Sequence, residues 1–263
     1  LPAIEPIPLE SITKPAAAGG SIISAADVTL DRVAISDSVA EAAISARGGA
    51  IFMSGGTLTL NNSIIYFNRT ADPAMQVAKD VPFQGGAITV INGSLKMLFS
   101  SVISNRNMLY QTSATPENRG IIDVNLVVPN PKYVLSIDRS IIVNQKASLS
   151  PTGDAADNVG LVIGCVNGST TMLSIMNTVI DSAALSSCSG ATLPSGMPIP
   201  NQLATTNAVF INPLSLPPPT AVTSNGFDTT FRSAVSAQCN GELDFFGVAR
   251  PKGLCMPGAV SVP

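Results

Sequence analysis

The stretch GGAIFMSGGTLTLNNSIIYFN, residues 48–68, returns nearly unchanged as GGAITVINGSLKMLFSSVISN, residues 85–105. Both copies open with Gly-Gly-Ala-Ile, continue with alternating apolar and polar residues, and end at an asparagine. A unit that recurs along a chain is typical of repeat proteins, in which each unit packs against the next one. These two stretches therefore decide the fold.

Weaker copies of the unit precede and follow these two. Their openings are GGSII from residue 19, GIIDV from residue 120 and GLVIG from residue 160, and their endings are VTLDRVAISDS at 28–38, VLSIDRSIIVN at 134–144 and MLSIMNTVIDS at 172–182. In the copy at 95–105, we expect the alignment to slip by one residue at the polar break. The chain thus contains about five units, joined by loops of different lengths.

Each unit has the signature of short β-strands. Period-two alternation and β-branched residues predict three strands per unit, and only Ser38–Arg47 has helical character. One such unit cannot bury its inner face alone, so the units must stack as the coils of a parallel β-helix. The expected inward stack places Ile51, Leu58, Leu60 and Ile65 on Ile88, Leu95 or Met97, Leu98 and Ile103 of the next coil.

The strand ends predict a polar column. Asn68, Asn105 and Asn144 close three of the copies, and Asp37 and Ser182 stand in their place in the outer two. Stacked amides can hydrogen-bond along such a column and satisfy the backbone at the bend. The polar break before the last strand holds Asp31, Asn61 and Asp138, which is expected turn chemistry.

Composition limits the class of protein. The chain has 263 residues, 45% of them hydrophobic and 12% charged, so it can bury a large core. Its net charge is −3 and its lysines and arginines are scattered, which argues against nucleic acid as a partner. No run of about 18 apolar residues predicts a membrane span.

Three regions follow from these patterns. We interpret the first residues, LPAIEPIPLE, as a mature or excised N-terminus, and residues 1–18 as a proline-rich lead-in. Residues 19–263 form the repeat domain, with coils over about 19–182 and a wrapping and closing segment over 183–263.

Cysteines and glycosylation motifs bear on the compartment. Four cysteines allow two disulfides in three connectivities, and we prefer Cys165–Cys188 with Cys239–Cys255 because each closes a short loop. The alternative is four free thiols in a cytosolic protein. Asn-x-Ser/Thr motifs occur four times and permit a secreted protein, with candidate glycosylation at Asn61, Asn68, Asn92 and Asn167.

The openings and the endings Ile65–Asn68, Val102–Asn105 and Ile141–Asn144 resemble the repeats of chlamydial polymorphic outer-membrane proteins. More broadly, the pattern resembles right-handed β-helix proteins of the pectin-lyase-like superfamily. The C-terminal residues NAVFINPLS (207–215) and LDFFGVARPKG (243–253) are similar to the closing segment of choice-of-anchor secreted β-helix proteins. The resemblance implies an all-β, right-handed, single-stranded parallel β-helix with a disulfide-stapled C-terminal cap.

Within that closing segment, Asp244 and Arg250 are expected to form an ion pair or turn-capping set that closes the last coil. The alternative is an exposed clamp for a ligand. Cys239 and Cys255 bracket the same segment, in agreement with a stapled cap.

Catalytic chemistry has few candidates. The chain has no histidine, so a Ser-His-Asp triad and a histidine-assisted hydrolase site are excluded. A calcium-dependent lyase would need converging carboxylates and a cationic base, and the weak candidate set is Asp123, Asp138, Arg139 and Asp181, predicted to fall in successive coils. Turn chemistry explains these residues better, so we expect no catalytic site and no resident cofactor, with calcium needed only in the lyase alternative.

The sequence therefore predicts an extracellular structural or adhesive module of a cell-surface or appendage protein. Its partners would be other extracellular proteins or glycans, bound through corner loops or the lateral face. Head-to-tail self-association or a longer parent chain would follow from uncovered strand edges at the ends of the coils. The alternative function is a polysaccharide lyase or hydrolase acting on acidic glycans.

Overall fold

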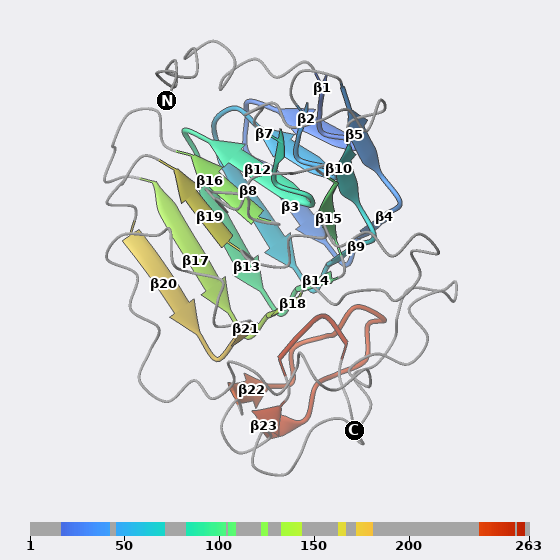
Figure 1. The fold of residues 1–263 in the computed structure, drawn as a ribbon. Coiled ribbons are helices and arrows are strands. Elements are labelled where there is room, and N and C mark those ends of the chain that lie inside the picture. Colours follow the sequence, from blue (N-terminus) through green and yellow to red (C-terminus); the bar gives the residue numbers. More distant parts are fainter. Residues whose placement is uncertain are drawn as a thin grey trace.

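The computed structural model of the chain is all-β (Figure 1). It describes residues 17–42, 46–71, 83–103, 105–108, 122–125, 133–143, 163–166, 172–180, 237–255 and 257–260. These described residues contain no helix, and hence none long and apolar enough to cross a membrane. The predicted fold class is confirmed at this level.

Strands β1 to β21 follow one another in five turns of the chain, which we call rungs 1 to 5. Rungs 1 and 2 are β1 Ala17–Ala18, β2 Ile22–Ser24, β3 Val28–Asp31, β4 Ala34–Ser36 and β5 Val39–Glu41, then β6 Ala46–Arg47, β7 Ile51–Met53, β8 Thr57–Asn61, β9 Ile64–Tyr66 and β10 Arg69–Ala71. Rung 3 is β11 Phe83–Gln84, β12 Ile88–Ile91, β13 Ser94–Leu98, β14 Ser101–Ile103 and β15 Arg106–Met108. Rungs 4 and 5 are β16 Ile122–Asn125, β17 Val134–Asp138 and β18 Ile141–Val143, then β19 Ile163–Val166, β20 Met172–Met176 and β21 Val179–Ile180.

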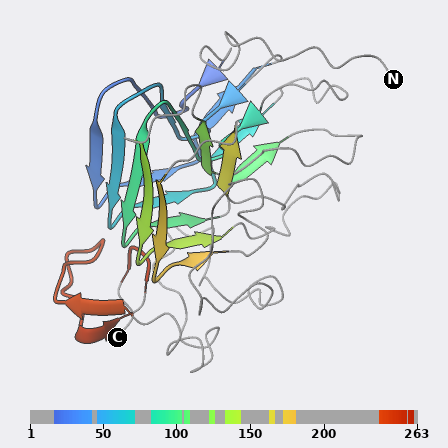
Figure 2. The same cartoon turned by 90° about the vertical axis from the view of Figure 1, so that its left-hand side faces the viewer.

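Each rung gives one strand to each of three five-stranded sheets, and neighbouring strands in these sheets are parallel (Figure 2). Three five-stranded sheets have the orders β19-β16-β12-β7-β2, β20-β17-β13-β8-β3 and β21-β18-β14-β9-β4, and we call them the β7, β8 and β9 sheets. Two three-stranded sheets, β1-β6-β11 and β15-β10-β5, complete the first three rungs. Strands that pair only with the equivalent strands of the neighbouring rungs are the arrangement that the sequence repeat predicts.

Each of the first three rungs contains five strands, two more than the predicted three. The additional strands are the short pairs and triplets before the Gly-Gly opening and after the closing asparagine or serine. Two of them, β5 and β6, occupy the stretch Ser38–Arg47 whose sequence has helical character. Residues Ala17–Ala18, assigned to the lead-in, already pair with Ala46–Arg47. Residues 183–236 of the predicted wrapping segment lie outside the described part.

The register between rungs 2 and 3 contains no slip. Thr57 lies opposite Ser94 at one end of the β8–β13 pair and Asn61 opposite Leu98 at the other. The predicted one-residue slip is therefore wrong: Leu60 stacks on Met97, and Leu98 points outward with 37% of its surface exposed. The cause of the wrong register is Phe99. Its apolar side chain hides the polar break in the sequence, although the residue forms the corner after β13.

The core is built by side chains that repeat at the same position of each rung. Leu58, Leu95 and Leu135 form one inward column of the β8 sheet, and Leu60, Met97 and Ile137 form the next. Ile51, Ile88 and Ile122 form the equivalent column of the β7 sheet, and Ile65, Val102 and Ile142 that of the β9 sheet. All of these side chains are at most 2% exposed, so each rung buries its inner face against its neighbours.

A ladder of buried hydroxyl groups runs along the corner between the β8 and β9 sheets. Its members are Ser63, Ser100, Ser140 and Thr178, one in each of rungs 2 to 5. Each hydroxyl accepts a hydrogen bond from the backbone N–H of the equivalent residue in the preceding rung, at 3.2–3.3 Å. Each also donates to the carbonyl two residues before it, at 2.7–3.0 Å. We call this the hydroxyl ladder; it satisfies the backbone at the sharpest bend of each rung.

The predicted asparagine column exists at the next bend. Asn105 Oδ1 accepts from Asn68 N and from Asn68 Nδ2, and Asn105 Nδ2 donates to the carbonyls of Ile65 and Ile103. Asn68 makes the equivalent contacts toward rung 1, where its Oδ1 accepts from Ser38 N. Ser38, and not Asp37, is therefore the rung 1 member of the column, because Asp37 takes the left-handed position just before it. Asn144 lies outside the described residues.

We predict that Asn105→Asp destabilises the protein by about 3 kcal/mol, because the carboxylate keeps the acceptor but loses both donors and faces two carbonyl oxygens in a buried site. Urea unfolding followed by circular dichroism measures this. Asn61→Asp is the matched control, since Asn61 lies on the outward face of β8; it should change the free energy of unfolding by less than about 0.5 kcal/mol. Equal effects of the two changes would show that the column carries no stability.

Candidate functional site

A column of residues with left-handed backbone marks the corner that precedes the hydroxyl ladder. Arg32, Asn62, Phe99, Arg139 and Asn177 have φ angles of 55°, 47°, 47°, 49° and 47°, and each follows the last residue of its strand in the β8 sheet. The N–H of each of the first four donates to a carbonyl of the next rung. Asparagine tolerates this conformation, but it is unfavourable for arginine and phenylalanine. We call this set the corner column.

Against the corner column lies the C-terminal clasp, which we define as residues 237–255 and 257–260. Its strands β22 Ala237–Asn240 and β23 Lys252–Cys255 pair antiparallel, and the Cys239–Cys255 disulfide joins them. The predicted pairing of these two cysteines is confirmed. Both cysteines are buried against Phe99 of the corner column, so the stapled hairpin packs directly on rung 3.

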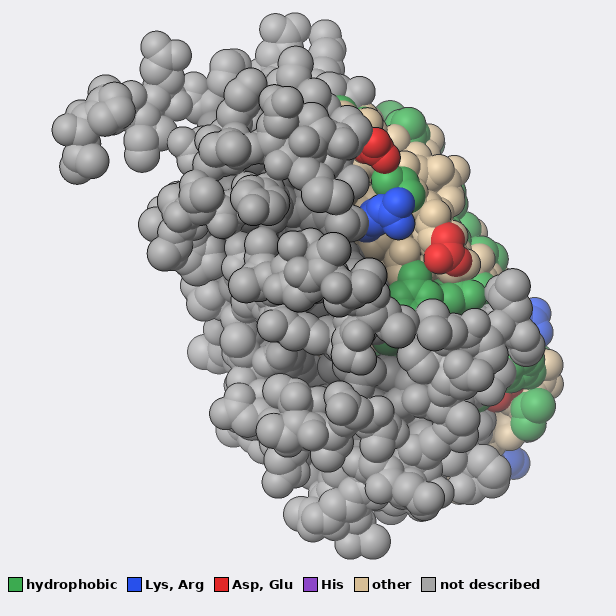
Figure 3. All heavy atoms as spheres, turned by 45° about the vertical axis from the view of Figure 1, so that its right-hand side comes forward, with side chains coloured by type: hydrophobic (Ala, Val, Ile, Leu, Met, Phe, Trp, Pro, Cys, Tyr) green, Lys and Arg blue, Asp and Glu red, His purple; other side chains and the backbone are tan. Residues whose placement is uncertain are grey.

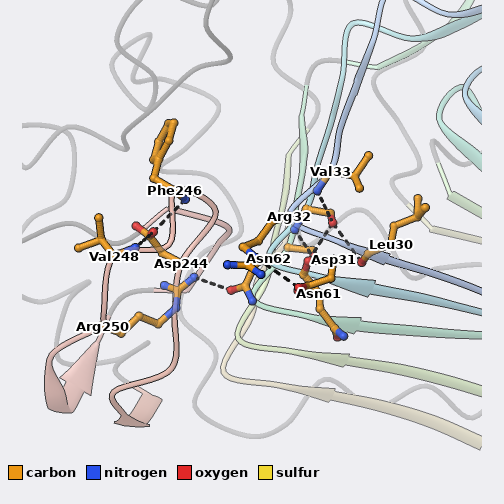
Figure 4. Close-up of polar contacts among 12 residues, drawn as sticks. Leu30, Asp31, Arg32, Val33, Asn61, Asn62, Asp244, Phe246, Val248 and Arg250 are labelled. Carbon is orange, nitrogen blue, oxygen red and sulfur yellow. Dashed lines mark hydrogen bonds and ion pairs between the residues drawn. The ribbon is translucent and has the colours of Figure 1, made fainter.

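Arg250 connects the clasp to the corner column (Figure 4). Its guanidinium lies 4.0 Å from the centre of the Phe99 ring, and its Nη2 donates to Asn62 Oδ1 at 3.1 Å. Arg139 lies over the same ring at 5.3 Å, so Phe99 contacts two guanidinium groups. Burial of Arg250 lowers its pKa to about 10, while the negative charges of Asp244 and Glu242 oppose this shift. Arg250 therefore remains a cation at neutral pH, held in a dry site by its partners.

The last described residues fill the space between the clasp hairpin and the rungs. Gly258 N donates to the carbonyl of Arg139, and Ala259 N donates to Ser101 Oγ. Their carbonyl oxygens both accept from Arg250 Nη2, at 2.8 and 3.1 Å. Gly258 has a φ of 100°, and a Cβ there would stand 2.7 Å from Ile141 Cδ1, so only glycine fits. This tail covers Ser101 and Ile141, which explains why these outward-facing residues of β14 and β18 are buried.

Asp244 organises the loop that presents Arg250. It is 2% exposed, and its Oδ1 accepts from Phe246 N at 2.9 Å and from Val248 N at 2.8 Å. Glu242 supports the same loop by accepting from Asn240 N, and backbone hydrogen bonds lower its pKa. Asp244 thus caps a turn, as one form of the sequence prediction has it.

Among the described residues, the clasp contacts the side of the rungs, whereas the sequence predicts a cap that closes the last coil. Its hydrogen bonds and packing contacts are with Asn62, Phe99, Ser101, Arg139 and Ile141 of rungs 2 to 4, and Gly247 lies beside Arg32 of rung 1. The clasp therefore lies on the side of the rungs, along the corner. The place of the clasp at the end of the sequence suggested a cap on the final rung. The partners of Arg250, however, are Asn62 and Phe99 of the corner column.

The weak catalytic set does not assemble as predicted. Asp123 in β16 and Asp138 in β17 lie in the same rung and in different sheets, and not in successive coils. Asp138 accepts from Asn177 Nδ2 at 3.0 Å, and its Oδ2 lies 3.6 Å from Arg139 Nε. Asp181 is outside the described part of the chain, within which no three His, Cys, Asp or Glu residues form a metal-binding group.

The remaining sequence-predicted sites have different surroundings. The side chain of Asn68 is fully buried and its Nδ2 is used in the asparagine column, which leaves no room for a glycan on the folded chain. Asn61 and Asn92 are half-buried at the surface. Asn167 and Cys188 lie outside the described residues, and only the backbone of Cys165 is described, so the Cys165–Cys188 pairing stays a prediction.

Sequence reasoning missed the residues that hold the clasp. Neither Phe99 nor Asn62 was singled out from the sequence, and the hydroxyl ladder was not recognised. A signal was available: serine or threonine recurs two residues after the β8-sheet strand in four copies, at 63, 100, 140 and 178. No sequence signal pairs Arg250 with Asn62, because 188 residues separate them.

We predict that Arg250→Lys releases the tail almost as completely as Arg250→Met. Lysine keeps the charge but loses the planar fork and the stacking on Phe99, so the carbonyls of Gly258 and Ala259 lose their shared donor. Hydrogen exchange at Gly258 and Ala259 should accelerate at least tenfold in both variants, a loss of about 1.4 kcal/mol or more. Lys252→Met, at an exposed position of β23, is the control and should leave these amides protected. Protection in Arg250→Lys equal to that of the unmodified protein would show that charge alone holds the tail.

A second prediction concerns the disulfide. The double change Cys239→Ser and Cys255→Ser opens a loop with a sequence separation of 16 and should destabilise the clasp by about 3 kcal/mol. The clasp should then open at lower urea concentration than the rungs, whose ladders do not involve it. Hydrogen exchange at Ala237–Asn240 reports the clasp and exchange at Leu95–Leu98 reports the rungs. Simultaneous loss of protection in both would contradict independent opening.

No family model, curated protein or solved structure matches this chain. The resemblance to β-helix families therefore stays a prediction, and the function is argued from the ladders, the corner column and the clasp.

Proposed function

We propose that the chain is an extracellular structural or adhesive module, built as a single right-handed parallel β-helix that binds its partners through its lateral face and corner loops. Right-handedness is supported by a general rule, since connections between parallel strands are right-handed in nearly all proteins. The five-stranded parallel sheets, with one strand from each rung, are what such a β-helix contains.

The observation that carries the proposal is the use of the repeated polar side chains. Asn68, Asn105, Ser63, Ser100 and Ser140 are all fully buried and hydrogen-bonded to the backbone of a neighbouring rung or of their own. Residues that the repeat preserves therefore maintain the stack and are turned away from solvent. Because the recurrent polar groups are used in internal ladders, they hold the rungs rigidly together. The result is an extended, rigid surface, which is the property that a scaffold needs.

The outward face of the β8 sheet offers such a surface. One residue from each rung stands in a row along it, in register across the strands: Thr29, Thr59, Lys96, Ser136 and Ser174. Neighbouring members are about 4.8 Å apart, the spacing of strands in a sheet. Lys96 is the one charged member of this row, so a partner would be held by shape and hydrogen bonds more than by one sign of charge. On the side of Figure 1 where β5 and β10 lie, the described surface in Figure 3 likewise mixes apolar, uncharged polar and single charged side chains.

The clasp supports an extracellular location. Its disulfide holds the hairpin that covers Phe99, and disulfides of this structural kind persist in oxidising compartments. The same bond would be reduced in most cytosols, where the clasp would lose its staple.

A depolymerisation screen tests the proposal against its main alternative, a lyase or hydrolase. The protein is incubated with pectate, alginate, hyaluronan and neutral glycans, with and without calcium, while unsaturated uronates and new reducing ends are measured. We expect neither product above the level of heat-unfolded protein.

Turnover that disappears in Asp138→Asn but persists in Asp31→Asn would overturn the proposal. Asp31 is the matched control because it occupies the same position of the β8 sheet in rung 1 and also lies beside an arginine, Arg32, at 3.3 Å. Turnover lost in both variants would equally establish an enzyme, with a site that extends along the β8 sheet from Asp31 to Asp138.

A further inference from the structure

The loop between β22 and β23 exposes three large apolar side chains. Leu243, Phe246 and Val248 are 47%, 48% and 58% exposed, and they lie within six consecutive residues. In Figure 4, Phe246 and Val248 point away from Asn62 and the rungs, on the side of the loop opposite to the Arg250 contact. We call residues 243–248 the apolar tip. Exposed apolar groups that are clustered, and not scattered, indicate a contact surface.

Every backbone N–H from residue 244 to residue 248 is already used inside the clasp. Asp244 N donates to Val248 O, Gly247 N to Asp244 O, and Phe245 N to Ala259 O. Phe246 N and Val248 N both donate to Asp244 Oδ1. The apolar tip therefore has five consecutive donors that need no water.

The one charged group of the apolar tip is likewise buried and bonded within the loop. Asp244 is its only ionisable residue, and it is buried and bonded to two N–H groups. Exposed charges lie beside the loop: Arg32, whose Nη1 is 3.8 Å from the ideal Cβ position of Gly247, pairs with Asp31, and Lys252 of β23 follows Arg250 in the sequence. An apolar tip with no exposed charge of its own, flanked by charges of both signs, is compatible with the boundary between lipid hydrocarbon and zwitterionic headgroups.

We propose that the apolar tip is a membrane-contact site that inserts Leu243, Phe246 and Val248 into the interfacial layer of a zwitterionic phospholipid bilayer. Lipid hydrocarbon offers no hydrogen-bond partner, so N–H groups that approach it must be satisfied internally, as those of residues 244–248 are. A protein partner would typically be met with several hydrogen bonds, and the apolar tip has no free N–H among residues 244–248 to give. The disulfide and Asp244 hold the loop in shape, so insertion costs little ordering of the chain.

This site is separate from the lateral face in the proposed function and does not rest on it. The two ideas can also fail separately. Cleavage of a polysaccharide would end the scaffold proposal and leave lipid contact intact, whereas absence of lipid binding would leave the scaffold proposal standing.

The chain contains no tryptophan, which permits a direct test with all 263 residues present. Phe246→Trp places one indole in the apolar tip, and Ile23→Trp places one at a 65% exposed position of β2 as a matched control. Each is titrated with phosphatidylcholine vesicles. We expect a blue shift, and quenching by lipids brominated on the acyl chain, for Phe246→Trp only, with little change when salt is raised.

Flotation with the same vesicles gives the second measurement. Phe246→Ser with Val248→Ser should lower the vesicle-bound to free ratio at least tenfold, and Ile23→Ser should leave it unchanged. Both positions are exposed, so the variants keep the clasp, as the protection of Gly258 and Ala259 would verify.

Three results would overturn the proposal. The first is no binding of the unmodified protein to vesicles, and the second is an equal loss in Ile23→Ser. The third is self-association in sedimentation that vanishes in the Phe246→Ser, Val248→Ser variant without vesicle binding, which would make the apolar tip a contact between protein molecules.

Discussion

The hydroxyl ladder is the constraint on which the other features of the structure depend. Each of its hydroxyls accepts the N–H of the preceding rung and donates to a carbonyl of its own rung, so one side chain fixes both the bend and the register. If a rung slipped by one residue, the hydroxyl would leave a buried N–H without a partner and every inward leucine or isoleucine would turn outward. Because all five rungs bend at the same place, side chains just before the ladder form a straight column, and that column is where the clasp binds.

The corner column shows how a regular repeat can carry a unique docking surface. Its side chains point away from the core, so the repeat does not dictate their identity, and they vary from arginine to asparagine to phenylalanine. Left-handed backbone costs Phe99 and Arg139 about 1–2 kcal/mol each relative to a relaxed conformation. Contact with Arg250 and the disulfide offsets that cost at Phe99, and the Asn62, Phe99 and Arg139 combination occurs at one height of the stack only. The clasp is therefore held at rungs 2 to 4.

Much of the fold was predictable because its signals are local. The period-two alternation and the repeated opening can both be recognised within about 40 residues of the chain. The stacked parallel strands, the inward columns and the Asn68–Asn105 contact follow from that local pattern. The predicted slip at Phe99 was wrong because a residue at the left-handed corner need not be polar when another segment, here the clasp, covers it. The clasp position and the Arg250 contacts could not be derived, since they join residues far apart in sequence through shape and not through a repeated motif. For the same reason Asp138 was predicted to stack on Asp123, although the two share one rung.

The hydroxyl ladder also has a direction, and this bears on self-association. Rungs 2 to 5 each present a serine or threonine hydroxyl to the preceding rung, whereas rung 1 has Val33 at that position and Ser38 in place of the asparagine. If rung 1 of one molecule stacked on rung 5 of another, the N–H of Thr178 would meet the Val33 side chain, which has no acceptor. The same junction would end the asparagine column in a serine too short to bridge two rungs. Rung 1 therefore carries the substitutions of a terminal repeat. The ladders thus argue against seamless head-to-tail stacking of rung 1 on rung 5, and the lateral face and the clasp remain the proposed contact surfaces.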